Sequence, residues 1–165
     1  MDTKDLRLLQ QTLTHTLLLT GRQWRRVADL ATDRHGISEA KALPLVMIGR
    51  MGGEPRQNAL AEAVGIEGPS LVRLLDQLEA AGLVARKEDP SDRRAKVLSL
   101  TPTGRTVVER MEADLACLRE AMFAEVSPSD LEACLRVFRV VQDFARETTA
   151  GGAAGIEALR GEAAE

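Results

Sequence analysis

Aromatic residues and cysteines are scarce in this 165-residue chain, and each shortage excludes a class of protein. Tyrosine is absent, and one tryptophan and three phenylalanines are the only aromatic residues. Modules that bind single-stranded nucleic acid need several exposed rings for base stacking, so the sequence argues against that class. Two cysteines, Cys117 and Cys134, cannot form a disulfide framework, which predicts a reducing, cytoplasmic environment.

Metal ligands, membrane-spanning runs and catalytic motifs are also missing. His15 and His35 are the only histidines and lie far from the cysteines in sequence, so no zinc site is expected. The longest apolar runs, such as 17–19, are far shorter than the roughly 20 residues that span a bilayer. No signal-peptide pattern, paired carboxylates, Gly-rich phosphate loop or nucleophile elbow is found. We therefore expect no membrane partner, no metal, no cofactor and no enzymatic activity.

The length and the charge distribution indicate one soluble domain with a local basic surface. A chain of this size forms one domain, at most with an appendage. The formal net charge is −3, but residues 1–55 carry +2, residues 56–105 carry +1 and residues 106–165 carry −6. Within 86–105 there are six basic residues against three acidic ones. An acidic protein of this kind can still bind DNA through a local phosphate-binding surface.

Apolar periodicity predicts three helices in the first 64 residues. A spacing near 3.6 indicates one long helix over about 4–34, with Gly36 past its end. Ser38 is a suitable N-cap for a second helix to about residue 50, in which Pro44 predicts a kink. A short helix follows over about 57–64.

The next segment predicts a helix and a hairpin. Gly68-Pro69 opens a helix that Gly82 ends, with leucines 71, 74, 75 and 78 on one face. Residues 83–87 and 96–100 are expected to form two short strands joined by a polar loop. Two helices joined by a tight turn and followed by a charged hairpin constitute a winged helix-turn-helix, in which one helix fits the major groove. Such a motif also occurs in protein-interaction modules, and a charged loop alone is usually a solvated turn.

Two long helices are expected at the C-terminal end. Thr101-Pro102 begins one that runs to about residue 125 with a heptad seam. Ser127 begins another, over about 128–147, through a capping box. The residues from about 148 onward, rich in Ala and Gly, predict a mobile tail, within which 156–160 could form a turn of helix.

Four motifs stand out in the middle of the chain: residues 65–79, Gly82-Leu83-Val84, Asp92-Arg93-Arg94-Ala95-Lys96 and Leu100-Thr101-Pro102-Thr103-Gly104. With these motifs the chain resembles the multiple-antibiotic-resistance regulator (MarR) family, and within it the SlyA-type branch. The resemblance is dense over about 57–105 and looser outside it, although the helix order fits to about residue 147.

The resemblance implies a DNA-binding transcriptional regulator, commonly a repressor, that binds a pseudo-palindromic operator as a homodimer. Ser70 and Arg73 match recognition-helix residues, with Gln77 on the same face. Arg94 matches the wing-tip arginine of the minor groove and Asp92 its orienting partner. Arg93 and Arg86 would contact phosphates. Such a protein would be cytoplasmic and associated with the bacterial nucleoid through DNA.

The implied architecture is mainly α with a small β-hairpin, a winged helix-turn-helix joined to a helical dimerisation domain. The apolar terminal helices exceed what a winged module needs to cover its core, which independently favours a twofold pair. An intramolecular helical subdomain is the alternative. The expected organisation is 1–36 as N-terminal dimerisation helix, 37–105 as DNA-binding domain, 106–147 as C-terminal dimerisation helices and 148–165 as tail.

Members of the family often bind small aromatic carboxylates between the dimerisation helices and the winged module. Arg22, Trp24 and Arg25 match positions of the SlyA branch, and a guanidinium can clamp a carboxylate. Where that branch has Trp and His on the second helix, this chain has Ala42 and Val46, which predicts another ligand or none. The arginines could instead pair with Asp29 or Asp33. The two cysteines are expected to be buried and inert, and a ligand-independent activator or an interaction module without DNA binding are the alternative functions.

Overall fold

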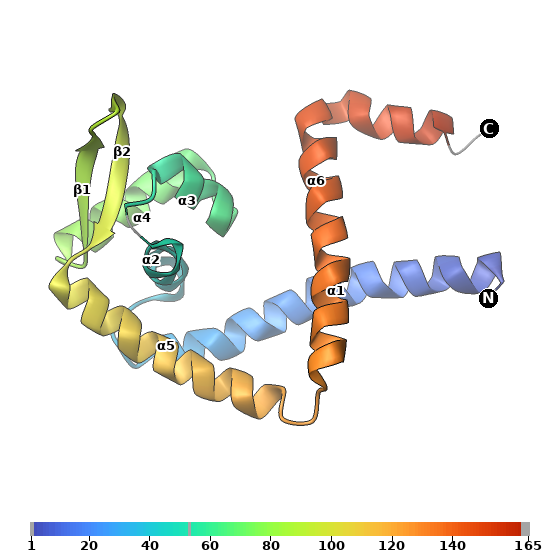
Figure 1. Ribbon diagram of the computed structural model, residues 1–165, viewed down its shortest axis with the longest axis horizontal. Coiled ribbons are helices and arrows are strands. Elements are labelled where there is room, and N and C mark those ends of the chain that lie inside the picture. Colours follow the sequence, from blue (N-terminus) through green and yellow to red (C-terminus); the bar gives the residue numbers. More distant parts are fainter. Residues whose placement is uncertain (1, 53, 163–165) are drawn as a thin grey trace. The chain divides into compact units, whose positions relative to one another are not determined.

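The computed structural model describes residues 2–52 and 54–162, apart from the side chains of residues 39, 93, 151 and 153–162. The chain divides into two compact units, Met1–Arg119 and Glu120–Glu165. The fold is mainly α with one two-stranded hairpin, as expected (Figure 1). The elements are α1 (Thr3–Asp33), α2 (Glu39–Met51), α3 (Gln57–Val64), α4 (Gly68–Ala80), β1 (Val84–Asp89), β2 (Asp92–Leu100), α5 (Pro102–Met122) and α6 (Pro128–Glu162).

Helix α1 is long and leaves most of its apolar side chains in solvent. Leu8 is 64% and Leu18 65% exposed in the single chain. The C-terminal end of α1 is tied to α5, because Arg34 Nε donates to Asp114 Oδ2 at 2.7 Å and His35 Nε2 lies 2.6 Å from the same oxygen. The first unit therefore fixes one end of α1 and leaves the apolar side chains of the other end uncovered.

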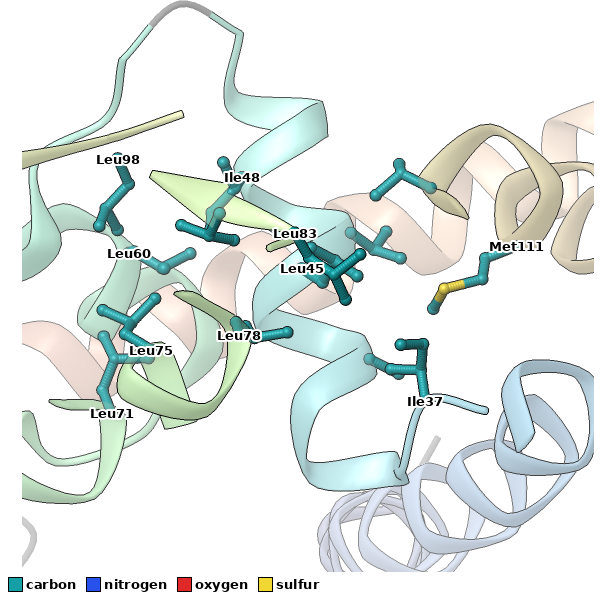
Figure 2. Packing of buried hydrophobic residues seen from close by; sticks show 14 residues of the cluster. Ile37, Leu45, Ile48, Leu60, Leu71, Leu75, Leu78, Leu83, Leu98 and Met111 are labelled. Carbon is teal, nitrogen blue, oxygen red and sulfur yellow. The ribbon is translucent and has the colours of Figure 1, made fainter. Parts of the chain in front are cut away.

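The hydrophobic core lies in the winged module around α2. Helix α2 continues through the buried Pro44, where a kink was expected. Leucines of α4, the expected apolar face, meet it: Leu71, Leu75 and Leu78 are fully buried, and Leu74 is partly buried. Figure 2 shows these side chains converging from α2, α3, α4 and the hairpin. The buried cluster comprises Ile37, Ala42, Leu45, Val46, Ile48, Leu60, Leu71, Leu75, Leu78, Leu83, Val84, Leu98, Val108 and Met111.

The hairpin is longer than the sequence predicted. Strands β1 and β2 pair antiparallel from Val84 with Leu100 to Asp89 with Asp92, with a register irregularity between Glu88 and Asp89. The segment before α3 pairs briefly with β2. The Leu98 backbone N–H donates to the Pro55 carbonyl at 2.9 Å, and Arg56 forms an isolated antiparallel β-bridge with Val97. The hairpin is thus anchored along one side by the chain that leads into α3.

Helix α5 starts next to the residues that lead into β1. The Thr101 backbone N–H donates to the Leu83 carbonyl at 3.0 Å, and the Thr101 hydroxyl donates to the Gly82 carbonyl at 2.6 Å. The same hydroxyl accepts from the Gly104 N–H at 3.0 Å, which caps the first turn. Gly104 is buried directly over the Leu83 carbonyl. The turn after α4 and the start of α5 therefore form one joint.

The second unit consists mainly of α6. Its expected cap is present, since the Ser127 hydroxyl accepts from the Asp130 N–H at 3.1 Å. The helix continues to Glu162, beyond the expected end near residue 147, with a break in helical backbone at Gly152. The segment expected to be a mobile tail is helical on both sides of that glycine, because alanine, which is abundant there, favours helix. Val140 is 69% and Phe144 52% exposed in the single chain.

Candidate nucleic-acid interface and adjoining cavity

Helix α4 presents a polar face outward from the winged module. Its leucines hold the opposite face in the core, because residues three and four apart lie on one side of a helix. Ser70, Arg73 and Gln77 lie away from that buried row, and all three are exposed. The preceding turn positions the helix start: Gly65 adopts a left-handed φ of 64°, and the Ile66 N–H returns to the Ala61 carbonyl at 3.1 Å. One helix face of this kind fits a major groove.

The hairpin tip carries Arg94 into solvent. The Arg94 side chain is 98% exposed, the pose of a group free to enter a groove. The Asp92 carboxylate accepts from the Arg94 backbone N–H at 3.1 Å, and its Oδ1 lies 4.0 Å from Arg94 Nε. Asp92 therefore holds the backbone of the tip and stands close to the guanidinium. The side chain of Arg93, an expected phosphate contact, lies outside what the structure describes.

A second polar network, which the sequence did not indicate, stiffens the same tip. Arg56 Nε donates to Asp89 Oδ2 at 2.6 Å, and Arg56 Nη2 donates to the Ser91 hydroxyl at 3.0 Å. Asp89 Oδ1 accepts from both the backbone N–H and the hydroxyl of Ser91, at 2.7 Å each. Hydrogen bonds from Ser91, with a smaller contribution from Arg56, lower the pKa of Asp89 to about 2. The only sequence signal was the turn-forming run 89–92.

Arg86 lies between the hairpin and α4. Its Nη2 donates to Asp76 Oδ1 at 2.6 Å, and its Nε donates to Glu79 Oε2 at 2.8 Å. Hydrogen bonds to Glu79 and then Asp76 raise the pKa of the Arg86 guanidinium. This residue, expected to meet DNA phosphates, is thus engaged with two carboxylates of the recognition helix in the unbound protein.

A cavity of about 350 Å³ lies between α1 and the winged module. Of the five residues proposed for a ligand, Trp24, Arg25, Ala42 and Val46 line it, whereas Arg22 is absent from its wall. Ala42 and Val46 are buried and form its apolar floor. Two arginines that the sequence did not suggest, Arg50 and Arg119, also line it. Three guanidinium groups, one indole ring and the Asp29 carboxylate therefore border this cavity, whose floor is apolar.

The two additional arginines share one carboxylate of α5. Arg50 donates to Glu112 through Nε at 2.5 Å and Nη2 at 3.0 Å, and Arg119 Nη1 donates to Glu112 Oε2 at 3.3 Å. Hydrogen bonding with Arg50 lowers the pKa of Glu112 and raises that of Arg50. Because Arg50 lies in the last turn of α2, this pair connects the cavity wall and the winged module with α5.

The cysteines, clusters of metal-ligand side chains and membrane-spanning helices were also subjects of sequence-based expectations. Cys117 and Cys134 are exposed in the single chain, where burial was expected. Within the described residues, no cluster of histidine, cysteine and acidic side chains has the proximity that a metal ion needs. None of the described helices combines the length and the apolar character needed to traverse a bilayer.

Comparisons with known proteins agree with this geometry. Residues 35–95 match a family model described as the MarR family. Transcriptional regulator PA3341 is 36% identical, with 81% of this chain and 98% of that chain covered and a TM-score of 0.75. Two structures at 20% identity share the fold: Staphylococcus aureus MarR in complex with salicylate and kanamycin (87% and 96% covered, TM-score 0.73), and a mutant of S. aureus MepR bound to an oligodeoxyribonucleotide (79% and 96%, TM-score 0.53).

The match to the regulator covers far more than the winged module. It extends over four fifths of this chain, and nearly the whole of that protein is included. Because such identity is maintained over that length, and because the family model falls on α2 to the hairpin, this chain belongs to the MarR family of transcriptional regulators.

Proposed function

We propose that the protein is a repressor that binds a pseudo-palindromic operator as a homodimer and is released by a small aromatic carboxylate. The observation that carries the DNA-binding part is an outward polar face on α4 together with a hairpin tip that exposes Arg94. Helix α4 and the β1–β2 hairpin belong to the same module (Figure 1). We also propose that the chain belongs to the SlyA-like branch of the family, which the motifs at 65–79 and 92–96 support.

In this proposal each module reads two grooves. Ser70, Arg73 and Gln77 of α4 meet base edges and phosphates in the major groove, where one helix fits. Arg94, oriented beside Asp92, enters the adjacent minor groove, whose negative potential attracts arginine. Arg93 neutralises phosphate near the tip. The MepR mutant, which shares the fold, is bound to an oligodeoxyribonucleotide, and this supports DNA as the partner.

Two copies of the chain are proposed to pair through their terminal helices. Large apolar side chains on α1 and α6 are exposed in the single chain, among them Leu8, Leu18, Leu135 and Val140. Extensive exposed apolar surface of this kind marks an interface. A twofold pair would bury it and would present two winged modules to two half-sites of an operator. Cys134 lies on α6, one of the helices of this proposed interface, and Cys117 lies on α5.

The cavity beside Trp24 is proposed to hold the effector. Its apolar floor suits an aromatic ring, and guanidinium groups at its border suit a carboxylate. The salicylate complex of S. aureus MarR supports this class of ligand. We assign the carboxylate to Arg25 in preference to Arg22, because only Arg25 of the two lines the cavity.

DNA binding is tested with the region upstream of the protein's own gene in a gel shift. Arg94→Ala should weaken binding by about 1–3 kcal/mol, the contribution of one good groove contact. Binding should also fall steeply with added salt because phosphate contacts release counterions. Arg110→Ala removes one exposed charge outside the winged module and serves as the control.

Three outcomes would contradict the proposal. Equal affinities of the wild-type protein and Arg94→Ala at matched salt would remove the minor-groove contact. A molar mass of one protomer in analytical ultracentrifugation, at concentrations where DNA is bound, would remove the twofold mode. DNA that fails to bind at any salt concentration would leave an interaction module as the function.

A further inference from the structure

The Arg86 side chain is largely enclosed, and its guanidinium already makes several hydrogen bonds within the protein. Its side chain is 22% exposed, whereas the neighbouring Lys87 on the same strand is 66% exposed. Arg86 Nη2 contacts Asp76 at 2.6 Å and Glu79 at 2.5 Å, and Nε contacts Glu79 at 2.8 Å. One guanidinium therefore bridges two carboxylates that lie three residues apart on α4, a spacing that puts both on one side of the helix.

These carboxylates occur on the helix that faces DNA in the proposed function. Asp76 and Glu79 are 55% and 41% exposed, so both reach solvent near Arg73 and Gln77 on the same helix. An unpaired carboxylate near phosphates repels them, and the repulsion grows as water is excluded from the interface. If Arg86 moved to a phosphate, it would leave two negative charges on the recognition helix without this partner.

We propose that Arg86 is a positioning residue of the DNA-binding module. It neutralises Asp76 and Glu79 and fixes the hairpin against α4, so that Arg94 and the outward face of α4 reach their two grooves together. The inference rests on the proposed function, and it replaces the phosphate contact that the family resemblance implied for this residue. The forked guanidinium suits this role, because it can bond two carboxylates in fixed directions, which an ammonium group cannot do.

A charge-conserving substitution distinguishes two roles for Arg86: a clamp, meaning the contact of its guanidinium with Asp76 and Glu79, and a contact with a DNA phosphate. The experiment compares the wild-type protein, Arg86→Lys, Arg86→Gln and the control Lys87→Gln on the same upstream DNA over a series of salt concentrations. A lysine is an adequate point charge for phosphate but cannot make the fork. We expect Arg86→Lys and Arg86→Gln both to lose about tenfold or more in affinity, the effect of about one groove contact, with an unchanged salt slope. Lys87→Gln should change affinity by less than about threefold, as expected of a rim charge.

A measurement of unfolding in the absence of DNA tests the clamp independently of the DNA-binding proposal. In urea unfolding, Arg86→Gln and Glu79→Gln should be strongly non-additive, because each removes the same contact. Additive effects would overturn the inference, as would wild-type affinity in Arg86→Lys, or a salt slope reduced by about one in Arg86→Gln. A wild-type protein that binds no DNA would overturn the proposed function instead, and the unfolding cycle would still report whether the clamp exists.

Discussion

At the scale of single residues, the hairpin tip depends on a carboxylate whose oxygens are already bonded within the protein. Asp89 is buried, and its two oxygens accept from Ser91 and Arg56. Charged groups of this kind stay ionised when hydrogen bonds replace lost water. The backbone from Asp89 to Asp92, where the strands turn, is therefore held in one conformation, and Arg94 extends from a fixed base.

The pKa of Asp89 provides a direct test of this arrangement. Ser91→Ala removes the hydroxyl donor, the largest cause of the lowered pKa, so the pKa of Asp89 should rise from about 2 towards its ordinary value of 3.8. A carboxyl pKa that is lower in the folded protein stabilises it above the unfolded-state value, and this stabilisation is lost as pH falls through the folded pKa. The stability difference between wild type and Ser91→Ala should thus shrink between about pH 4 and pH 2.

The measurement is a carboxyl-carbon NMR titration with urea unfolding at each pH. Ser129→Ala, which removes a serine of the second unit, is the matched control and should leave the Asp89 titration as it is in the wild type. If Asp89 titrates at the same pH in Ser91→Ala as in the wild type, Ser91 does not hold the carboxylate.

The sequence predicted the outward residues of the site better than the bonded ones. Local pattern put Ser70, Arg73 and Gln77 on the outward helix face and Arg94 in the hairpin loop. The family resemblance, and not the pattern, singled out Arg94 as the wing-tip arginine. The bond between Arg56 and Asp89 joins residues 33 positions apart, and nothing local indicates it. Arg86 was placed on the right strand, but its carboxylate partners belong to another element.

At the scale of elements, the joint between the hairpin and α5 limits what residue 104 can be. A Cβ on Gly104 would collide with the Leu83 carbonyl, which already accepts from the Thr101 N–H. The clash is with backbone, so no side chain can move to relieve it. The sequence Thr101-Pro102-Thr103-Gly104 therefore combines a cap, a helix start and a site of close approach.

Gly104→Ala should destabilise the protein, although alanine favours helix over glycine. Overpacking in a site that cannot relax costs about 1–3 kcal/mol. Gly21→Ala is the control of opposite sign, because Gly21 lies within α1 with open space around its Cα, and the change should stabilise by up to about 1 kcal/mol. Urea midpoints of both variants at one protein concentration give the comparison. Equal shifts of both midpoints would show that helix propensity alone decides.

Element boundaries show where periodicity stops being informative. The helices began and ended within a few residues of the predicted positions wherever apolar side chains faced the core. The hairpin extended to Asp89 and Asp92 because backbone pairing continues through polar residues that give no alternating pattern. Beyond residue 147 the sequence predicted a tail with at most a turn of helix over 156–160, because its Ala and Gly content is typical of a tail. The helix nevertheless continues on either side of Gly152, since alanine favours helix.

At the scale of the whole molecule, the cavity exists only because elements far apart in sequence meet. Its wall takes Trp24 and Arg25 from α1, Ala42 and Val46 from α2 and Arg119 from α5. Family resemblance suggested the first four, but Arg50 and Arg119 became visible only in the folded chain. Because Glu112 bonds both of these arginines, a ligand at the cavity border lies next to the contact that joins α2 to α5. Effector binding and the placement of the winged module are therefore coupled in our proposal.

The single tryptophan makes this coupling measurable, since Trp24 lines the cavity and is the only indole in the chain. Benzoate should change Trp24 fluorescence and weaken binding to the upstream DNA, and neutral benzamide should do neither. Arg25→Gln should weaken benzoate binding about tenfold or more, because a hydrogen bond between charged groups contributes about 1.5–3 kcal/mol. Arg22→Gln removes the same charge three residues away, off the cavity wall, and should retain wild-type affinity. Equal losses of benzoate affinity in the two variants would mean that only the general positive charge of α1 attracts the anion. If benzoate changes neither the fluorescence nor the DNA binding of the wild-type protein, the cavity is excluded as a site for aromatic carboxylates.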